Sequence, residues 1–219
     1  MSSKPDTKPP VRVGFIGAGN WAEYNHMPTL KGRADVALVG IATPTQASRD
    51  RVQANFGIPF ATPDYRDLLN QPLDAVVISS PHGYHYEQAK AALAANLHVL
   101  VEKPMTLRAG EAWELVALAD QKERVLMVPT GWHYNRMVLA AKEQMGQGAV
   151  GQVEYMLCHI GSALRNLYTG QPWPYTLDSI PDPKAHYSDP AVAGGGQGYS
   201  QLSHSLAMLL WLTGLRATE

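Results

Sequence analysis

An acid and a lysine follow directly on an apolar run in the segment HVLVEKPMT, residues 98–106, before a proline. The run reads as a strand, and parallel strands end at the crevice where doubly wound folds bind ligands. Pro104 removes backbone freedom beside Lys103, and desolvation by a bound ligand would lower the pKa of the amine. We therefore interpret Lys103 as aimed at the hydroxyl of a small polar substrate; the alternative is an exposed lysine near a turn.

A glycine-rich turn follows the first apolar run of the chain and has the sequence Gly17-Ala18-Gly19-Asn20-Trp21-Ala22. In a G-x-G-x-x-A turn between a strand and a helix, the glycines allow a tight bend and close approach to a pyrophosphate. The free N–H groups of the helix start then face the phosphates. The pattern predicts a dinucleotide site that includes Gly17, Gly19, Asn20 and Trp21; the alternative is a glycine turn that serves packing alone.

The second apolar run ends in Thr43-Pro44-Thr45 and lacks the carboxylate that accepts hydrogen bonds from the ribose of NAD. Its absence removes the repulsion of a 2′-phosphate, so NADP is slightly favoured over NAD. The nearby groups that could donate to such a phosphate are Thr43, Thr45, Ser48 and Arg49. The alternative is that Arg49 and Arg51 only solvate an exposed helix.

Apolar β-rich runs alternate with helix-like stretches through the first part of the chain. The expected strands are residues 11–17, 36–42, 75–80, 98–102 and 125–129, and the expected helices are 20–31, 45–56, 86–96 and 107–122. Continuous apolar strands suit a parallel sheet that is covered on both faces. The alternation predicts an α/β fold, a Rossmann doubly wound parallel sheet over residues 11–130 that follows a disordered tail at 1–10.

The pattern changes after Gly131. The later expected elements are a helix at 136–147, a strand at 151–160, an irregular stretch at 162–198 and a helix at 199–213. Leu202, Leu206, Leu209 and Leu210 form a stripe, which predicts a core helix. His204 lies opposite that stripe, so we expect it to face solvent or a cleft, and the upstream glycine run favours a cleft. Residues 131–219 read as the start of a second α+β domain, a substrate and dimerisation domain that we expect to be truncated.

Composition limits the possible partners. Lys and Arg number 18 against 19 Asp and Glu, and the charges are scattered, which argues against nucleic acid and anionic lipid. Cys158 is the single cysteine, and the first ten residues have no apolar stretch of the kind a secretory signal needs. No histidine pair has metal-ligand spacing. We expect a cytoplasmic protein without a metal that acts on small molecules.

The glycine turn, the segment from Pro81 to His85 and Glu102-Lys103-Pro104 together resemble the glucose-fructose oxidoreductase / inositol dehydrogenase / rhizopine catabolism (Gfo/Idh/MocA) family. The later stretches GAVGQVEY and SHSLAMLLWLTG are similar to that family as well. The resemblance implies an NAD(P)-dependent oxidoreductase that moves hydride between a sugar or polyol hydroxyl carbon and the nicotinamide. It implies that Lys103 lies near nicotinamide and substrate and that His204 acts as acid and base.

Further contacts are expected around the same crevice. The cofactor side is expected to include Ser80, His82, His85 and Glu102. The substrate side is expected to include Trp132, Arg136, Ser200 and Gln201, with His133 and Asn135 as further crevice candidates. A purely structural role is the alternative for His82, His85, Trp132, His133, Asn135 and Arg136. Weaker candidates for sugar hydroxyls are Tyr187, Gln197 and Tyr199.

The sequence departs from the family in two ways. Many members carry an aspartate where this chain has Ser200, and a serine cannot buffer a proton as a carboxylate does. Members also continue into a larger sheet that often mediates dimers, so we expect a homo-oligomer if the second domain is complete. The alternative readings are a non-catalytic NAD(P)-binding sensor or regulatory protein and, less favoured, NAD-assisted glycoside cleavage.

Overall fold

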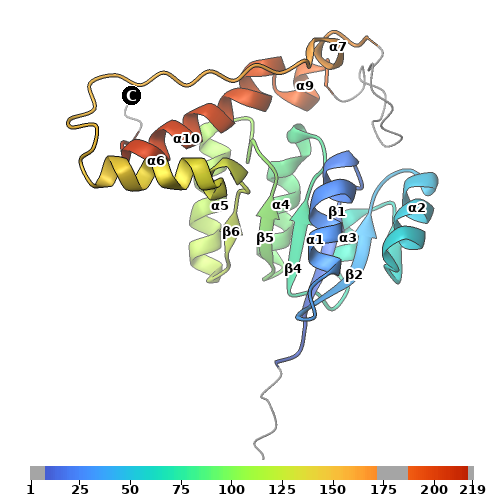
Figure 1. Ribbon diagram of the computed structural model, residues 1–219. Helices are drawn as coiled ribbons and strands as arrows, with labels where there is room; N and C mark the ends of the chain where they lie inside the picture. The colour runs from blue at the N-terminus through green and yellow to red at the C-terminus, as the bar shows by residue number, and fades with distance from the viewer. Residues whose placement is uncertain (1–7, 172–186, 217–219) are drawn as a thin grey trace, which may run out of the picture.

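The computed structural model describes residues 8–171 and 187–216, and six parallel strands form its central sheet (Figure 1). The strands are β1 Val11–Ile16, β2 Val36–Ala42, β3 Phe60–Thr62, β4 Ala75–Ile78, β5 His98–Val101 and β6 Leu126–Met127. Their order is β3-β2-β1-β4-β5-β6, and every neighbouring pair is parallel. This order is that of the Rossmann fold, so the predicted doubly wound sheet is confirmed.

Helices cover both faces of the sheet. They are α1 Met27–Lys31, α2 Gln46–Phe56, α3 Tyr65–Leu69, α4 His85–Ala94 and α5 Ala109–Lys122. Because side chains alternate along a strand, β1 sends Phe15 into a core with Met27 of α1 and Val52 of α2. Ile16 points to the other face and packs in a second core with side chains of α3, α4 and α5. The continuous apolar runs in the sequence follow from burial on both faces.

The remaining elements lie above the end of the sheet at which the strands finish (Figure 1). They are α6 Arg136–Gly146, α7 Arg165–Tyr168, α9 Pro190–Ala193 and α10 Ser203–Thr213. A π-helical turn at Gly198–Leu202 leads into α10, and a second π-helical turn at Ala22–His26 follows the glycine-rich turn. The expected helix at 199–213 therefore begins with a widened turn, and such turns are frequent at functional sites.

Two elements between α2 and β4 have no counterpart in the sequence prediction. β3 has three residues and lies between Pro59 and Pro63, which makes its apolar run too short to recognise. The side chain of Asp64 accepts a hydrogen bond from the N–H of Arg66 at 2.9 Å and caps α3. These two elements complete one edge of the sheet.

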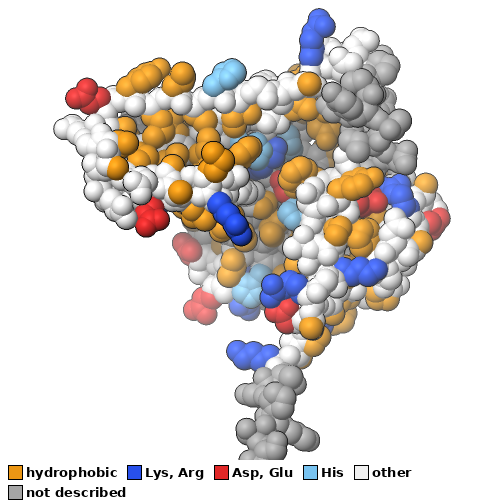
Figure 2. Space-filling view, in the orientation of Figure 1, with side chains coloured by type: hydrophobic (Ala, Val, Ile, Leu, Met, Phe, Trp, Pro, Cys, Tyr) orange, Lys and Arg blue, Asp and Glu red, His pale blue; other side chains and the backbone are white. Residues whose placement is uncertain are grey.

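The predicted strand at 151–160 is wrong. Residues 152–160 run as an extended segment that pairs with no strand among the described residues. A strand is stable only when a neighbour takes up its backbone hydrogen bonds. Without one, Tyr155 and Leu157 stay 81% and 76% exposed, and Figure 2 shows hydrophobic side chains gathered over this part of the molecule.

The prediction that the leucine stripe makes α10 a core helix is also wrong in part. Leu202 and Leu206 are 50% and 49% exposed, whereas Ser200 and Ser205 are buried. Ser200 and Ser205 therefore pack inward and Leu202 and Leu206 face outward, while Leu209 and Leu210 are partly buried. In the described ranges, none of the helices combines the length and apolar character needed to cross a bilayer.

Candidate active site

The glycine-rich turn bends sharply between β1 and the following helix. Gly17 has φ 93°, and its N–H donates to the carbonyl oxygen of Ala42 at 2.8 Å. A Cβ atom at Gly17 would lie 2.7 Å from the backbone nitrogen of Ser80 and 2.9 Å from the carbonyl oxygen of Ser79. Both the left-handed backbone and the close approach of the β4 loop therefore require glycine here.

A cleft of about 850 Å³ opens beside this turn, along the edge of the sheet at which the strands end. The loops after four strands line it, with Gly17, Gly19, Asn20, Trp21, Thr43, Thr45, Ser80 and His82 among the predicted contacts. This volume lies in the range of cofactor sites. The structure thus gathers most of the predicted cofactor contacts around one cavity.

Buried polar atoms in this cleft lack hydrogen-bond partners among the described residues. They are Oδ1 of Asn20 and Oγ of Ser79, and both residues line the cleft. Buried polar groups in folded proteins nearly always have a hydrogen-bond partner. Two such atoms without a partner at one cavity therefore point to a polar ligand. The cleft, its glycine turn and these atoms fit a dinucleotide.

Lys103 lies just after β5 and reaches across to the turn before α10. Its Nζ atom donates a hydrogen bond to the carbonyl oxygen of Ser200 at 2.9 Å. Burial lowers the pKa of Lys103, and the negative charge of Glu102 opposes that shift. The amine therefore loses its proton more readily than an exposed lysine does.

Glu102 joins the Lys103 loop to the helix that follows the glycine turn. One carboxylate oxygen lies 2.7 Å from Nε2 of His26, and the other accepts the backbone N–H of Lys103 at 3.1 Å. Glu102 is 8% exposed, so the pair is well shielded from water. Glu102 is thus placed to support the loop, and its predicted cofactor contact stays a prediction.

His204 sits on the inward face of α10, close to Lys103. Its Nδ1 atom is buried and has no hydrogen-bond partner among the described residues. Burial lowers the pKa of His204, and the positive charge of Lys103 lowers it further. A neutral imidazole with one unpaired ring nitrogen is able to take up or give a proton.

Sequence comparison places the chain among known proteins. A family model described as an oxidoreductase family with an NAD-binding Rossmann fold, Gfo/Idh/MocA, matches residues 11–130. The chain belongs to the Gfo/Idh/MocA oxidoreductase family. The resemblance seen in the sequence is confirmed.

Individual relatives agree with this assignment. The oxidoreductase sll0816 of Synechocystis is 30% identical over 94% of this chain and 52% of its own length. A dTDP-3,4-didehydro-2,6-dideoxy-alpha-D-glucose 3-reductase of Saccharopolyspora spinosa is 36% identical over 53% of this chain and 35% of its own.

The crystal structures similar to this one include a variant of KijD10, a 3-ketoreductase of Actinomadura kijaniata, bound to TDP-benzene and NADP. It is 28% identical, with a TM-score of 0.61, and the match covers 66% of this chain and 44% of that one. This chain therefore spans about half or less of the length of these Gfo/Idh/MocA relatives.

The two histidines after β4 have different surroundings in this Gfo/Idh/MocA chain. His85 is fully buried, and its two ring nitrogens lie 2.8 Å from the carbonyl oxygens of Ser80 and Pro104, so it ties the two loops together. His82 lines the cleft with Nδ1 at 3.1 Å from the carbonyl oxygen of Ala193. Burial lowers the pKa of His82 to about 4 and also lowers that of His85.

Arg49 folds back onto the loop after β2. Its guanidinium donates to the carbonyl oxygens of Thr43 at 2.6 Å and Pro44 at 2.8 Å, and Arg49 is not among the residues that line the cleft. Arg51 lines it instead and forms an ion pair with the buried Glu23. The predicted phosphate contact of Arg49 stays a prediction, although its hydrogen-bonding groups are largely occupied.

The predicted contacts near residue 132 lie away from the cleft lining. His133 stacks on Trp211 of α10, with ring centroids 5.0 Å apart, and Asn135 caps α6 by accepting the N–H of Met137 at 2.9 Å. Trp132, in the 3-10 turn Gly131–Tyr134, and Arg136, the first residue of α6, are exposed. The structure gives His133 and Asn135 packing and capping partners rather than a place in the cleft.

The remaining predicted site residues are Tyr187, Gln197, Tyr199 and Gln201, and they differ in whether they line the cleft. Tyr187 lines the cleft, and burial raises the pKa of its phenol. Gln197 and Tyr199 are exposed, and Gln201 is half-buried beside Ser200. Only Tyr187 of this group adds to the cavity.

Sequence reasoning missed the residues that the unexpected β3 and α3 bring to the cleft. They are Pro63, Asp64, Tyr65 and Arg66. The guanidinium carbon of Arg66 lies 4.7 Å from the centre of the Tyr65 ring. The pattern of proline and then aspartate before YRDLL was the available signal, since aspartate is a frequent helix cap.

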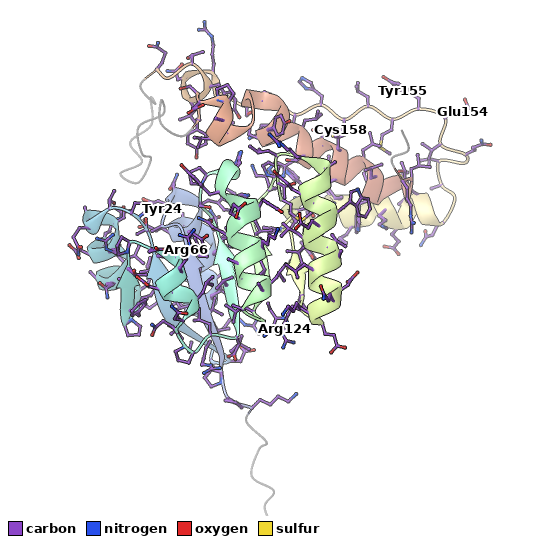
Figure 3. All side chains as sticks on the ribbon, turned by 180° about the vertical axis from the view of Figure 1, so that it is seen from behind. Tyr24, Arg66, Arg124, Glu154, Tyr155 and Cys158 are labelled. Atoms are coloured by element: carbon purple, nitrogen blue, oxygen red, sulfur yellow. The ribbon has the colours of Figure 1, made fainter. Side chains whose placement is uncertain are left out.

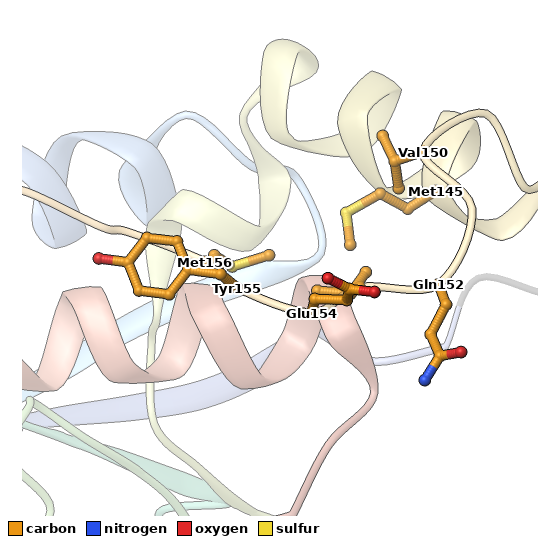
Figure 4. Close-up of a pocket in the computed structure, with 7 residues that line it drawn as sticks. Met145, Val150, Gln152, Glu154, Tyr155 and Met156 are labelled. Atoms are coloured by element: carbon orange, nitrogen blue, oxygen red, sulfur yellow. The ribbon is translucent and has the colours of Figure 1, made fainter.

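A second, smaller cavity of about 380 Å³ lies between the end of α6 and the extended segment (Figure 4). Met145, Val150 and Met156 line it together with Gln152, Glu154 and Tyr155. Glu154 is its only acidic or basic lining residue. This cavity gathers no set of groups for catalysis.

Proposed function

We propose that this protein is an NAD(P)-dependent oxidoreductase that transfers hydride between a sugar or polyol hydroxyl carbon and the cofactor. The observation that carries the proposal is that Lys103 lies close enough for its charge to act both on His204 and on His82, which lines the cleft of the glycine turn. The family supports an oxidoreductase, and the dTDP-glucose-derived 3-reductase among the relatives supports the substrate class.

The residues of the cleft have separate tasks in this proposal. The backbone around Gly17 and Gly19 would hold the pyrophosphate, and Asn20 and Ser79 would offer their unpaired polar atoms to the cofactor. When bound, the nicotinamide supplies the carbon that accepts or donates the hydride. Its ring would lie toward the loops after β4 and β5.

Lys103 and His204 would handle the proton of the reacting hydroxyl. Lys103 uses one of its N–H groups on Ser200, which leaves the others for the substrate oxygen. His204 offers a neutral ring with an unpaired nitrogen nearby. In the oxidising direction the hydroxyl gives its proton to this pair as the hydride leaves carbon, and in the reducing direction the pair returns it.

We propose NADP rather than NAD as the better ligand. The loop after β2 presents Thr43 and Thr45 without a carboxylate, and the cationic side chains of Arg51 and Arg66 line the same part of the cleft. The NADP bound in the KijD10 complex supports this preference for NADP over NAD. Asp64 lies in the same lining and reduces the expected preference.

A cofactor titration followed by a substrate panel tests the function. NADP and NAD are titrated into the protein by calorimetry, and aldoses, polyols and keto-sugars are then followed by the absorbance of reduced nicotinamide. Tight binding with turnover of at least one sugar or polyol supports the proposal. Binding without turnover favours the sensor alternative, and the absence of binding by either dinucleotide contradicts both.

A further inference from the structure

Tyr168 on the short helix α7 makes a contact that the proposed reaction does not use. Its phenol forms a hydrogen bond with the hydroxyl of Ser200, 32 residues further along the chain. Ser200 is 6% exposed, and the neighbouring Leu167 is 6% exposed, so α7 is anchored against the site by buried side chains. No sequence pattern indicates this contact, because α7 is a single turn of four residues.

Ser200 is held at its hydroxyl and at its carbonyl oxygen. Its side chain bonds to Tyr168, and its backbone carbonyl accepts the hydrogen bond from Nζ of Lys103 at 2.9 Å. The residue lies in the π-helical turn Gly198–Leu202, where the helix is not of regular α form. A side-chain anchor on such a turn fixes the direction in which its carbonyl points.

Lys103 needs such an anchor more than most side chains do. A lysine has a flexible four-carbon stem and about 2 kcal/mol of rotamer entropy. One bond from Nζ to a fixed carbonyl sets the position of the nitrogen and therefore the directions of its remaining N–H groups. Effective proton transfer requires that these groups meet the substrate oxygen within hydrogen-bond distance.

We propose that Tyr168 is a positioning residue for Lys103 and acts through Ser200. This inference rests on the proposed function for its effect on catalysis, but the arrangement of the three residues is a property of the free protein. Its consequences are therefore measurable without any substrate.

The titration of Lys103 reports the arrangement directly. If the Ser200 carbonyl is no longer held, the buried ammonium loses an acceptor, and its pKa falls further below the ordinary value. The other charged or titratable groups that influence this site are Glu102, His82, His85 and His204. None of them changes in a Tyr168 variant, so a shift reports the anchor.

The test compares Tyr168→Phe, Ser200→Ala and the double variant with the wild type. Tyr155→Phe is the matched control, because it removes the same hydroxyl from a tyrosine that is 81% exposed. Competitive amine labelling between about pH 7 and pH 11, read by mass spectrometry, gives the titration midpoint of Lys103. If Tyr168→Phe does not fold, Ser200→Ala carries the test, and Ser200→Thr serves as the rescue variant.

We expect a midpoint lowered by about half a unit or more in Tyr168→Phe and in Ser200→Ala, with no further shift in the double variant. Ser200→Thr and Tyr155→Phe should behave as the wild type. An unchanged midpoint in Tyr168→Phe and Ser200→Ala, or fully additive shifts, would overturn the inference. A shifted midpoint in a protein without turnover would leave this inference standing and would contradict the proposed function.

Kinetics provide a second readout where turnover is found. Tyr168→Phe should lower kcat about 3- to 10-fold and leave the dissociation constant of the cofactor unchanged. An equal loss of cofactor affinity would indicate a general disturbance of the site and would count against a positioning role.

Discussion

Nζ of Lys103 donates to the carbonyl oxygen of Ser200 at 2.9 Å and so joins the end of β5 to the turn before α10. His204 follows in the next turn, close enough for the charge of Lys103 to lower its pKa. The contact brings together two residues that are 97 positions apart in the sequence. The loop after β5 and the turn before α10 therefore lie against each other.

The two glycines of the turn should respond differently to alanine. Gly17→Ala should lower the free energy of unfolding by about 1–3 kcal/mol, because its Cβ meets the Ser79 and Ser80 backbone and its φ is positive. Gly19→Ala meets nothing closer than 4.0 Å and should leave stability unchanged while it weakens cofactor binding. Urea unfolding and calorimetric titration separate the two effects. Gly110→Ala, in an open position on α5, is the control, and equal behaviour of Gly17 and Gly19 would contradict this account.

Arg66 should discriminate between the two dinucleotides. Arg66→Ala is expected to weaken NADP about 5- to 20-fold and NAD less than 2-fold, because a guanidinium favours a phosphate over a hydroxyl. Arg124→Ala is the control, since Arg124 lies near the end of the sheet away from α10 (Figure 3). Calorimetric titration of both ligands measures the ratio, and equal losses for NADP and NAD would argue against a phosphate contact.

Glu102 should control the pH at which Lys103 becomes a base. The negative charge of Glu102 raises the pKa of Lys103, so Glu102→Gln should lower it. Oxidation of an alcohol needs the neutral amine, so the rising limb of the kcat/KM profile should move to lower pH. Glu114→Gln, at a surface ion pair with Lys90, should leave the profile unchanged. A limb that moves to higher pH in Glu102→Gln would contradict this electrostatic role.

His82 should make the fold sensitive to acid. Its pKa of about 4 in the folded protein lies below the ordinary value of 6.5, because burial disfavours the charged ring. The unfolded chain therefore binds a proton first, so this contribution to stability is complete above about pH 6.5 and is lost as the pH falls toward 4. We expect a loss of about 2–3 kcal/mol over this range that is absent in His82→Asn. Urea unfolding from pH 4.5 to 7.5 measures this loss, and His159→Asn, at an exposed histidine, is the control. If the free energy of unfolding of His82→Asn depended on pH as steeply as that of the wild type, the prediction would be wrong.

The sheet was predictable because burial on both faces leaves a mark in the sequence. Each of the longer strands is a continuous apolar run, and the glycine turn follows the first of them. β3 was not predicted because three residues between two prolines are too few to show the hydrophobic pattern of a strand. The extended segment at 152–160 shows the opposite case, in which an apolar run has no neighbouring strand among the described residues to pair with.

The candidate site was predictable only where a local motif marks it. Gly17 and Lys103 each stand in a recognisable local sequence at a strand end. Tyr168 comes from a short helix whose position depends on tertiary packing, and no spacing in the chain marks it. Arg66 also comes from a short helix, and the only local signal for it is the capping Asp64 after a proline. The leucine stripe of α10 was misjudged because periodicity shows that a helix has two faces but not which of them turns inward.

The most direct test of the central claim replaces the amine of Lys103 with an apolar chain of similar length. Lys103→Met and the control Lys122→Met, on α5, are compared in cofactor affinity and in turnover on the best sugar or polyol. We expect Lys103→Met to bind the cofactor within about 3-fold of the wild type and to lose at least about 10²-fold in kcat, whereas the control changes neither. Equal turnover in Lys103→Met and the wild type would contradict it.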